Sequence, residues 1–154
     1  TECPFKNTCV AFAQSMVTLL PVKTKGKKSR KRYFFYLVVE RDNSLLMKER
    51  RDKDIWQGLF DFMLIEKNRP VNPKLLMKEK DYRNWFPHKS DLRISRIYKH
   101  ILTHQTIHCR FIQIKTKGTF PLADDRFGFY SAAEIEQLPK PALISRFLDE
   151  RNNH

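Results

Sequence analysis

Two cysteines near the start of the chain, Cys3 and Cys9, are the side chains whose type most directly implies chemistry. Thiolates bind iron and zinc, but iron–sulfur clusters and structural zinc sites need about four protein ligands. The remaining sequence offers no obvious second pair, so the C-x5-C spacing represents half of such a site. We therefore expect this chain to be part of a longer protein whose chemistry lies upstream of Thr1.

Three histidines spaced four residues apart, His100, His104 and His108, form a second candidate metal site. Histidine is a common zinc ligand, and this spacing would align the rings on one face of a helix or of a strand. The segment lacks helical periodicity, and on a strand successive members of the set would lie about 13 Å apart. One ion cannot bridge that distance, so the spacing argues against a zinc site.

The composition indicates a globular domain with an anionic partner. The 154 residues are 41% hydrophobic and carry 30 Lys and Arg against 17 Asp and Glu, a net charge of +13. About half of this excess comes from the cations of residues 23–32, which are Lys23, Lys25, Lys27, Lys28, Arg30, Lys31 and Arg32. Like charges at this density resist packing, so we interpret residues 21–32 as a linker that could contact nucleic-acid phosphates. A solvated hinge is the compatible alternative.

The pattern beyond residue 32 predicts a domain of mixed α and β structure. Residues 33–39 are a continuous apolar run, which is typical of a strand covered on both faces. Ser131 and Glu134 have the spacing of a helical capping box. The expected strands are residues 33–39, 45–49, 55–65, 92–102, 105–115 and 127–130, and the expected helices are residues 73–86, 132–138 and a last one that begins at Pro141. This set of elements predicts an α+β sandwich.

Several motifs resemble those at the end of MutY-type adenine DNA glycosylases, in the same order and over essentially the whole chain. They are Cys3-Pro-x4-Cys9, Leu20-Pro21-Val-Lys, Arg32-Tyr-Phe-Phe-Tyr-Leu-Val-Val, Ile55-Trp-Gln-Gly-Leu-Phe-Asp-Phe62, His100-Ile-Leu-Thr-His104 and Leu138-Pro-Lys-Pro. The resemblance implies a Nudix-like fold, an α/β/α sandwich around a mixed, curved β-sheet. It divides the chain into the end of a catalytic and iron–sulfur domain (1–20), a basic interdomain linker (21–32) and a Nudix-like domain that recognises 8-oxoguanine (33–154).

The resemblance also matches Cys3 and Cys9 to the last two ligands of the family's 4Fe-4S cluster. The first two ligands are absent, so we expect the cluster in the full-length parent and none on this chain. Nudix hydrolases, in turn, hold magnesium with a glutamate-rich helix. The corresponding residues 74–83 have lysines and leucines instead, with isolated Glu79 and Asp81, so we expect no pyrophosphatase activity.

The site residues implied by the resemblance are Leu102, Thr103 and His104, which match the Phe-Ser-His loop with which the family contacts 8-oxoguanine. Oxidation turns guanine N7 into an N–H donor and adds an acceptor oxygen at C8, and a hydroxyl can pair with both. Thr103 retains this hydroxyl, Leu102 replaces the aromatic wedge with an aliphatic one, and His104 could reach a phosphate or a base edge. A tight turn between strands, with His104 bonded to a backbone group, is the alternative.

The expected function is therefore lesion recognition within an adenine DNA glycosylase of base-excision repair. The expected partners are double-stranded DNA with 8-oxoguanine:adenine mispairs and the catalytic domain of the same chain. The catalytic groups would lie in that domain, so this chain alone should be inactive. We expect a monomer without membrane contact in the bacterial cytoplasm, at the nucleoid, because the cysteine number is odd and no secretory signal is visible. A Nudix-type nucleoside-diphosphate hydrolase and a non-catalytic protein-interaction module are the alternatives.

Overall fold

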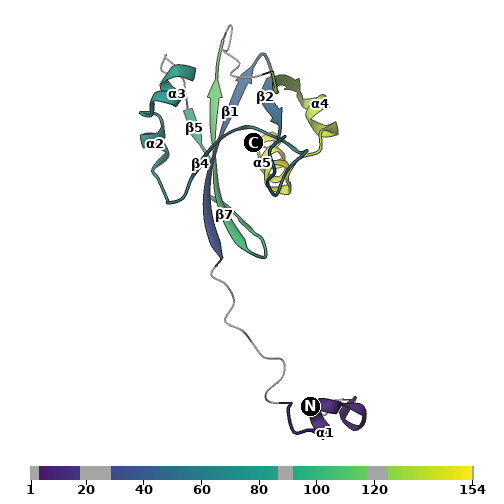
Figure 1. Ribbon diagram of the computed structural model, residues 1–154. Coiled ribbons are helices and arrows are strands. Elements are labelled where there is room, and N and C mark those ends of the chain that lie inside the picture. The colour runs from purple at the N-terminus through teal and green to yellow at the C-terminus, as the bar shows by residue number, and fades with distance from the viewer. Residues whose placement is uncertain (1–3, 18–28, 87–91, 118–124, 154) are drawn as a thin grey trace.

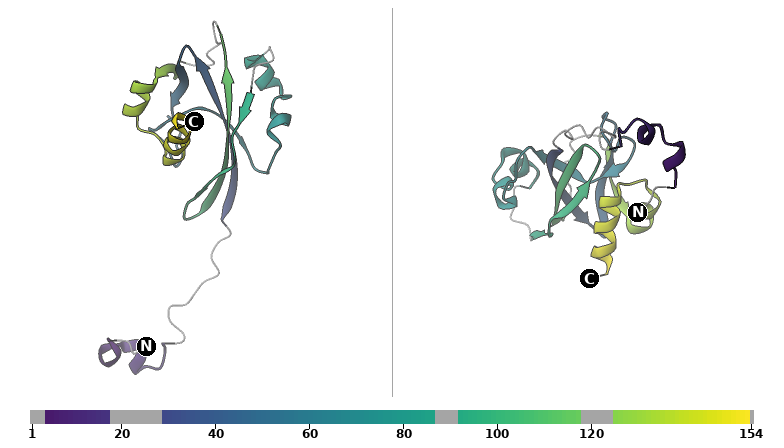
Figure 2. Two further views of the ribbon diagram at one scale, coloured as in Figure 1. Left: turned by 180° about the vertical axis from the view of Figure 1, so that it is seen from behind. Right: turned by 90° about the horizontal axis from the view of Figure 1, so that it is seen from below.

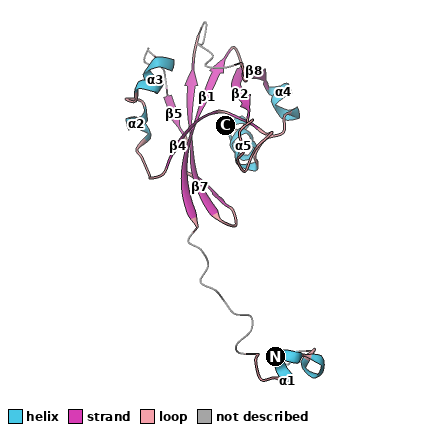
Figure 3. Cartoon of the chain, in the orientation of Figure 1, coloured by secondary structure: helices cyan, strands magenta, loops and turns pink. Residues whose placement is uncertain are grey.

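An eight-stranded β-sheet between two layers of helices forms the domain in the computed structural model (Figures 1 and 3). The structure describes residues 4–17, 29–86, 92–117 and 125–153. The strands are β1 (Arg30–Arg41), β2 (Ser44–Glu49), β3 (Phe60–Asp61), β4 (Met63–Lys67), β5 (Leu92–Ile94), β6 (Tyr98–Ile101), β7 (Gln105–Lys115) and β8 (Phe127–Ser131). The helices are η1 (Lys6–Thr8), α1 (Val10–Ala13), α2 (Pro73–Leu76), α3 (Lys80–Trp85), α4 (Ala132–Gln137) and α5 (Ala142–Asn152).

Strand β1 is the centre of the sheet. It runs parallel to β7 over eleven paired positions, from Arg30 opposite Gln105 to Glu40 opposite Lys115. On its other edge β1 pairs antiparallel with β4 and, at its end, with β2. Because neighbours and helices cover β1 on every side, the apolar run of residues 33–39 is buried almost throughout. The predicted α/β/α sandwich around a mixed sheet is confirmed.

Antiparallel pairings with β2 and with β7 complete the sheet. Asp42 and Asn43 both adopt positive φ angles, 49° and 61°, which is the conformation of the tight turn that joins β1 to β2. Strands β3 and β8 pair with β2, whereas β5 and β6 both pair with β7. The hairpin of β6 and β7 therefore lies beside the first half of β1.

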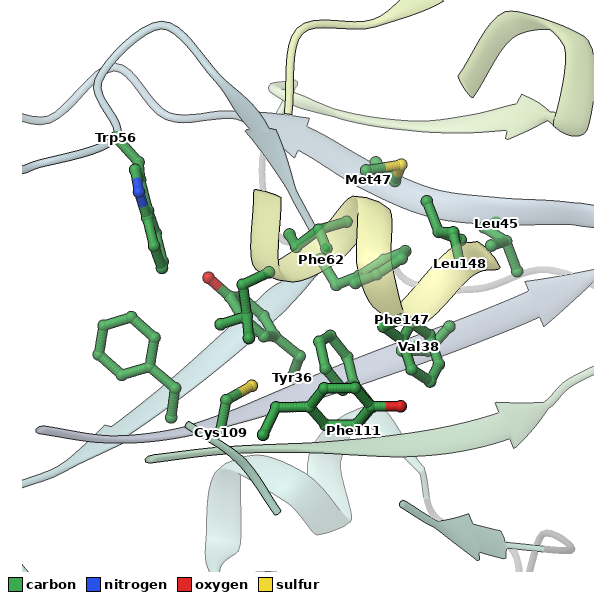
Figure 4. Close-up of a cluster of buried hydrophobic side chains, with 14 of the residues drawn as sticks. Tyr36, Val38, Leu45, Met47, Trp56, Phe62, Cys109, Phe111, Phe147 and Leu148 are labelled. Carbon is green, nitrogen blue, oxygen red and sulfur yellow. The ribbon is translucent and has the colours of Figure 1, made fainter. Parts of the chain in front are cut away.

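The alternating side chains of β1 and β7 divide the core into two clusters, one on each face of the sheet. One face carries Phe34, Tyr36 and Phe111, which belong to one buried cluster with side chains of α4 and α5. Figure 4 shows Tyr36 and Phe111 of this cluster beside Phe147 of α5. The rings of Phe111 and Phe147 stack there with centroids 3.9 Å apart. The opposite face carries Phe35 and its neighbours against α2 and α3. Figure 2 shows the two helical layers on opposite sides of the sheet.

Local hydrogen bonds explain the ends of the C-terminal helices. The Ser131 hydroxyl accepts from the backbone N–H of Glu134, and the Glu134 carboxylate accepts from the backbone N–H of Ser131, so the predicted capping box is present. Pro141 stands just before α5, as predicted. Between the two helices, the Lys140 ammonium donates to the Ile135 carbonyl at 2.6 Å and so satisfies a helix-end acceptor.

Two predicted elements are interrupted in the structure. The single helix expected over residues 73–86 is α2 and α3, because Glu79 is extended (ψ 147°) and its carboxylate pairs with Lys67 at 2.8 Å. The strand expected over residues 92–102 is β5 and β6. Between them the Ser95 hydroxyl accepts from the backbone N–H of Phe111 at 2.9 Å, which replaces a backbone acceptor in the ladder.

The segment expected to be extended over residues 55–65 begins instead as a compact loop before β3. The Gly58 N–H donates to the Arg50 carbonyl at 2.8 Å, and the φ angle of Gly58 is +80°. A residue with a Cβ rarely adopts this angle, so the glycine permits the loop. The chain is extended only from β3 onward.

The described part of the N-terminal segment contains little helix and exposes several apolar side chains. Helix α1 has four residues, and Phe5, Val10, Phe12 and Val17 are exposed large hydrophobic side chains. Across the part of the chain that the structure describes, no helix has the length and apolar character needed to cross a membrane.

Candidate nucleic-acid interface

The candidate lesion-binding residues form the turn between β6 and β7. The backbone N–H of Leu102 donates to the Gln105 carbonyl at 2.8 Å and closes the turn. The backbone N–H of Arg30 donates to the His104 carbonyl at 3.0 Å and ties the turn to the start of β1. Both bonds use backbone atoms, so the hydroxyl of Thr103 and the ring of His104 are left to interact with a ligand.

The three side chains of this turn have different environments. Thr103 and His104 are exposed, so a ligand can reach the hydroxyl and the imidazole. Leu102 is half-buried and packs against the core cluster on the α5 side of the sheet. The apolar side chain that projects from this hairpin is its neighbour Ile101, which is 69% exposed.

The histidines of this region lie on different faces of the hairpin. His100 pairs with Ile107, and its ring lies 5.8 Å from that of Trp56 on the core side. His108 pairs with Lys99 on the opposite face, because successive residues of a strand alternate between faces. The structure therefore does not bring the three imidazoles together. Among the described residues, no group of three or more His, Cys, Asp or Glu side chains could hold a metal ion.

The predicted basic linker ends earlier than expected. Strand β1 begins at Arg30, whereas Tyr33 was the predicted start of the domain. Arg30 and Lys31 are exposed on this strand. Four other predicted phosphate contacts lie outside the described residues, namely Lys23, Lys25, Lys27 and Lys28.

Arg32 requires a correction, because it is an internal ion-pair residue and not a mobile cation. Its side chain is 9% exposed, and its Nε lies 2.7 Å from Glu66 Oε1. One terminal nitrogen, Nη1, lies 3.1 Å from Asp54 Oδ1. These carboxylates raise the pKa of the guanidinium against the opposing effect of burial. Arg32 is therefore held inside the domain by its carboxylate partners, and the exposed cations of β1 are Arg30 and Lys31.

The pairs of Arg32 belong to a buried network that the sequence patterns did not indicate. Arg50 joins two carboxylates, with Nη1 2.5 Å from Asp61 Oδ2 and Nη2 2.6 Å from Asp54 Oδ2. The Tyr36 hydroxyl donates to Asp61 Oδ2 at 3.3 Å. Burial raises the pKa of Asp61, although its bond from Arg50 acts in the opposite direction. For Asp54 burial again acts to raise the pKa, but the hydrogen bonds from Arg32 and from the backbone N–H of Ile55, together with the charges of Arg32 and Arg50, lower it overall.

This network also reaches the candidate turn. Arg32 Nη1 donates to the side-chain oxygen of Gln105, the first residue of β7, at 3.4 Å. The network therefore connects the loop after β2 with β1, β4 and the base of the hairpin. An acidic residue within an aromatic segment, such as Asp61 between Phe60 and Phe62, was the signal in the sequence that could have indicated a buried ion pair.

The segment that would bear magnesium ligands in a hydrolase has a different character here. Glu79 pairs with Lys67, and Lys74, Lys78 and Lys80 are exposed on or beside α2 and α3. The side chain of Asp81 lies outside the described part of the chain. The described side chains of this segment therefore offer magnesium one carboxylate, and that carboxylate is already paired with a cation.

The three cysteines of the sequence do not fit a complete cluster. Cys9 is half-buried at the start of α1, and Cys3 lies outside the described residues. Cys109 is enclosed in the core on β7, where burial raises the pKa of its thiol well above the usual value. A 4Fe-4S cluster takes four thiolates, so this chain by itself lacks the donors for one.

Comparison with protein families gives one decisive match. The NUDIX domain model matches residues 34–150, which run from β1 to α5. The chain belongs to the NUDIX domain family. Among its described side chains, the segment of α2 and α3 shows no carboxylate cluster, and a shared fold does not require shared chemistry.

A curated relative and two solved structures extend this result. This chain is 26% identical over 119 residues to an adenine DNA glycosylase of Buchnera aphidicola subsp. Baizongia pistaciae, and the match covers 73% of this chain. This chain spans 30% of the length of that relative. The resemblance to MutY-type adenine DNA glycosylases is therefore confirmed.

The two structures share the fold. The C-terminal domain of mouse MUTYH, solved in complex with human PCNA, has a TM-score of 0.61 at 15% identity, with 81% of this chain and 90% of that one covered. A MutT protein of Methanosarcina mazei has a TM-score of 0.58 at 15% identity, with 82% and 98% covered. This fold is thus common to the C-terminal domain of mouse MUTYH and a MutT protein.

Proposed function

We propose that this chain is the lesion-recognition domain of a bacterial adenine DNA glycosylase, acting in the cytoplasm at the nucleoid. Residues 33–154 would inspect 8-oxoguanine opposite the adenine to be excised, and residues 21–32 would link them to a catalytic domain that ends within residues 1–20. Excision and the 4Fe-4S cluster, held in part by Cys3 and Cys9, would belong to the full-length parent. The relation to an adenine DNA glycosylase supports this assignment.

The observation that carries the proposal is the exposure of Thr103, a hydroxyl-bearing residue at the end of a closed hairpin. Guanine N7 accepts hydrogen bonds, whereas N7 of 8-oxoguanine donates one and O8 accepts one. A hydroxyl can accept from N7–H and donate to O8, so it favours the lesion over normal guanine. The backbone bonds of Leu102 and His104 would hold this hydroxyl in place. The exposed ring of His104 would add a contact to phosphate or to a base edge.

Substitution of Thr103 tests the proposal. We expect the 154-residue chain to bind an 8-oxoguanine:adenine duplex more tightly than a guanine:adenine duplex at low salt. Thr103→Val keeps the shape of the side chain but removes the hydroxyl, and should reduce this preference about fivefold, as expected for one hydrogen bond. Thr103→Ser retains the hydroxyl and should keep most of the preference. Fluorescence anisotropy with the two duplexes measures it, and an unchanged preference in Thr103→Val would refute the proposed role.

A protein-interaction module is the second candidate. Its support is the shared fold with the mouse MUTYH domain, which was solved with a protein partner. The same titrations separate the candidates, because a module of this kind would show no preference for the lesion duplex.

A further inference from the structure

The two faces of the hairpin near its turn differ in the side chains that they present. Leu102 turns toward the core cluster, whereas Ile101 precedes it in β6 and is exposed. Among the described residues 29–153, Ile101 is the most exposed large hydrophobic side chain, at 69%. Leu102, which was predicted to press between bases, is thus partly packed into the domain. Its neighbour Ile101 is exposed and could press between bases instead.

Strand register identifies the side chains that share a face with Ile101. Ile101 lies opposite Thr106 of β7, and Thr106 lies opposite Lys31 of β1. One row further along the strands, the partners are Lys99, His108 and Tyr33. Directly opposed residues of a sheet project from the same face. These six residues form one surface, which we call the open face.

Charge on the open face is positive. Lys31 and Lys99 are exposed, and none of the six positions carries a carboxylate. On the same side of the sheet, Lys67 lies opposite Tyr33 and its ammonium pairs with Glu79 at 2.8 Å, whereas Arg32 is paired with Glu66 and Asp54 on the opposite face. The exposed cations Lys31 and Lys99 therefore have no carboxylate directly opposite them in the strand register. Such a surface attracts an anionic ligand.

The open face also has apolar and aromatic character. The rings of Tyr33 and His108 stack with centroids 5.2 Å apart and an angle of 17° between their planes. A shallow hollow continues from them toward Ile97, which is 52% exposed, and Arg110. In Figures 1 and 2, the ends of β1 and β7 that carry this face extend beyond the helical layers, so a long ligand could lie along them.

We propose that the open face lies against duplex DNA, with Lys31 and Lys99 on phosphates and Ile101, not Leu102, as the apolar side chain inserted beside the lesion. Duplex DNA is the occupant because the face combines cations with an exposed aliphatic group and is continuous with Thr103. Lysines position a protein on phosphates, and an aliphatic wedge can enter between base steps. This inference rests on the proposed function and names the surface through which it operates.

The test compares the open face with a matched surface on the helices. Lys31→Ala/Lys99→Ala removes two charges, and Lys74→Ala/Lys80→Ala removes the same charge from α2 and α3. Two lost phosphate contacts should reduce the slope of log affinity against log salt by about 1.8 in the first variant and leave it unchanged in the second. Equal slopes in both variants would overturn the assignment of the open face to the DNA backbone.

A second comparison tests the wedge. Ile101→Ala should weaken binding of the 8-oxoguanine:adenine duplex roughly tenfold, as expected when part of a buried aliphatic side chain is removed. Leu75→Ala, at a leucine that is 54% exposed on α2, is the control and should have no effect. Wild-type affinity in Ile101→Ala would refute the wedge.

The two proposals fail in distinguishable ways. If the wild-type chain does not prefer the lesion duplex, the proposed function fails and the inference fails with it. If the preference depends on Thr103 but not on Ile101, Lys31 or Lys99, the function stands and only the open face is refuted. Circular dichroism of each variant confirms that the fold is intact before binding is measured.

Discussion

The two faces of the sheet beside the hairpin use neighbouring residues for opposite purposes. Lys31 is exposed on the open face, whereas Arg32 is buried in ion pairs on the core face. Ile101 and Leu102 differ in the same way. The pleat of a strand turns successive side chains to opposite sides, so one position along the chain separates an exposed residue from one that is packed into the domain. A run of cations in a sequence can therefore contain both kinds.

The largest effect should come from the core face, at Asp61. Asp61→Ala removes a carboxylate whose exposure is 0% and leaves Arg50 buried without one of its two partners. Breaking a buried pair in this way typically costs about 3–5 kcal/mol in the free energy of unfolding. Urea denaturation measures this loss. Replacing both partners, in Asp61→Ala/Arg50→Met, should recover part of it, and a single variant as stable as the wild type would show that the network is not structural.

A smaller effect should separate Leu102 from Ile101. Leu102→Ala removes contacts with the core and should lower the free energy of unfolding by about 1–2 kcal/mol. Ile101→Ala changes an exposed side chain, so its effect should stay within about 0.5 kcal/mol. Equal destabilisation by the two substitutions in thermal unfolding would contradict the difference between the faces.

The smallest effect should be the pH dependence of stability that Asp54 contributes. The pKa of Asp54 is lowered in the fold, so its ion pairs stabilise the protein fully above its usual pKa of 3.8 and are lost as the pH falls through the lower folded value. Asp54→Asn should therefore be less stable than the wild type by about 1 kcal/mol near pH 6, and this gap should close below pH 3.8. Unfolding at several pH values measures the gap. A gap that does not change with pH would mean that Asp54 acts through packing and not through its charge.

A separate prediction concerns the N-terminal cysteines. Reconstitution of the 154-residue chain with iron and sulfide should give no stoichiometric 4Fe-4S cluster, because Cys109 is enclosed in the core and two thiolates do not suffice. Iron and sulfide analysis with absorption spectroscopy measures this. A stoichiometric cluster would show that the chain recruits other ligands or a second copy.

Local patterns in the sequence predicted most of the elements. The apolar run of residues 33–39, the capping box at Ser131 and the turn before β7 depend on neighbours within a few residues, and all three are present. The split of the helix at Glu79 depended on Lys67, which is distant in the sequence. The break before β6 similarly depended on Ser95 meeting Phe111.

The candidate site likewise contains residues that a local motif predicted and residues whose role depends on distant partners. Thr103 was identified from a short motif, and its exposure is consistent with the role proposed for it. The partners of Arg32 could not be predicted, because Asp54 and Glu66 are brought to it by the pairing of β1 with β4 and by the loop after β2. In the sequence, Arg32 follows six other cations within residues 23–32, so it is indistinguishable from a linker residue until its carboxylate partners are known.

By itself, the sequence determined the character of the chain: a basic NUDIX domain without the acidic residues of a magnesium helix, and with a hydroxyl between two strand-forming segments. Only the tertiary structure decided which cations are free and which aliphatic side chain is exposed. The physical reason is that composition and spacing are properties of neighbours along the chain. The burial of a charge or a side chain, in contrast, depends on which distant strands are paired with it and in which register.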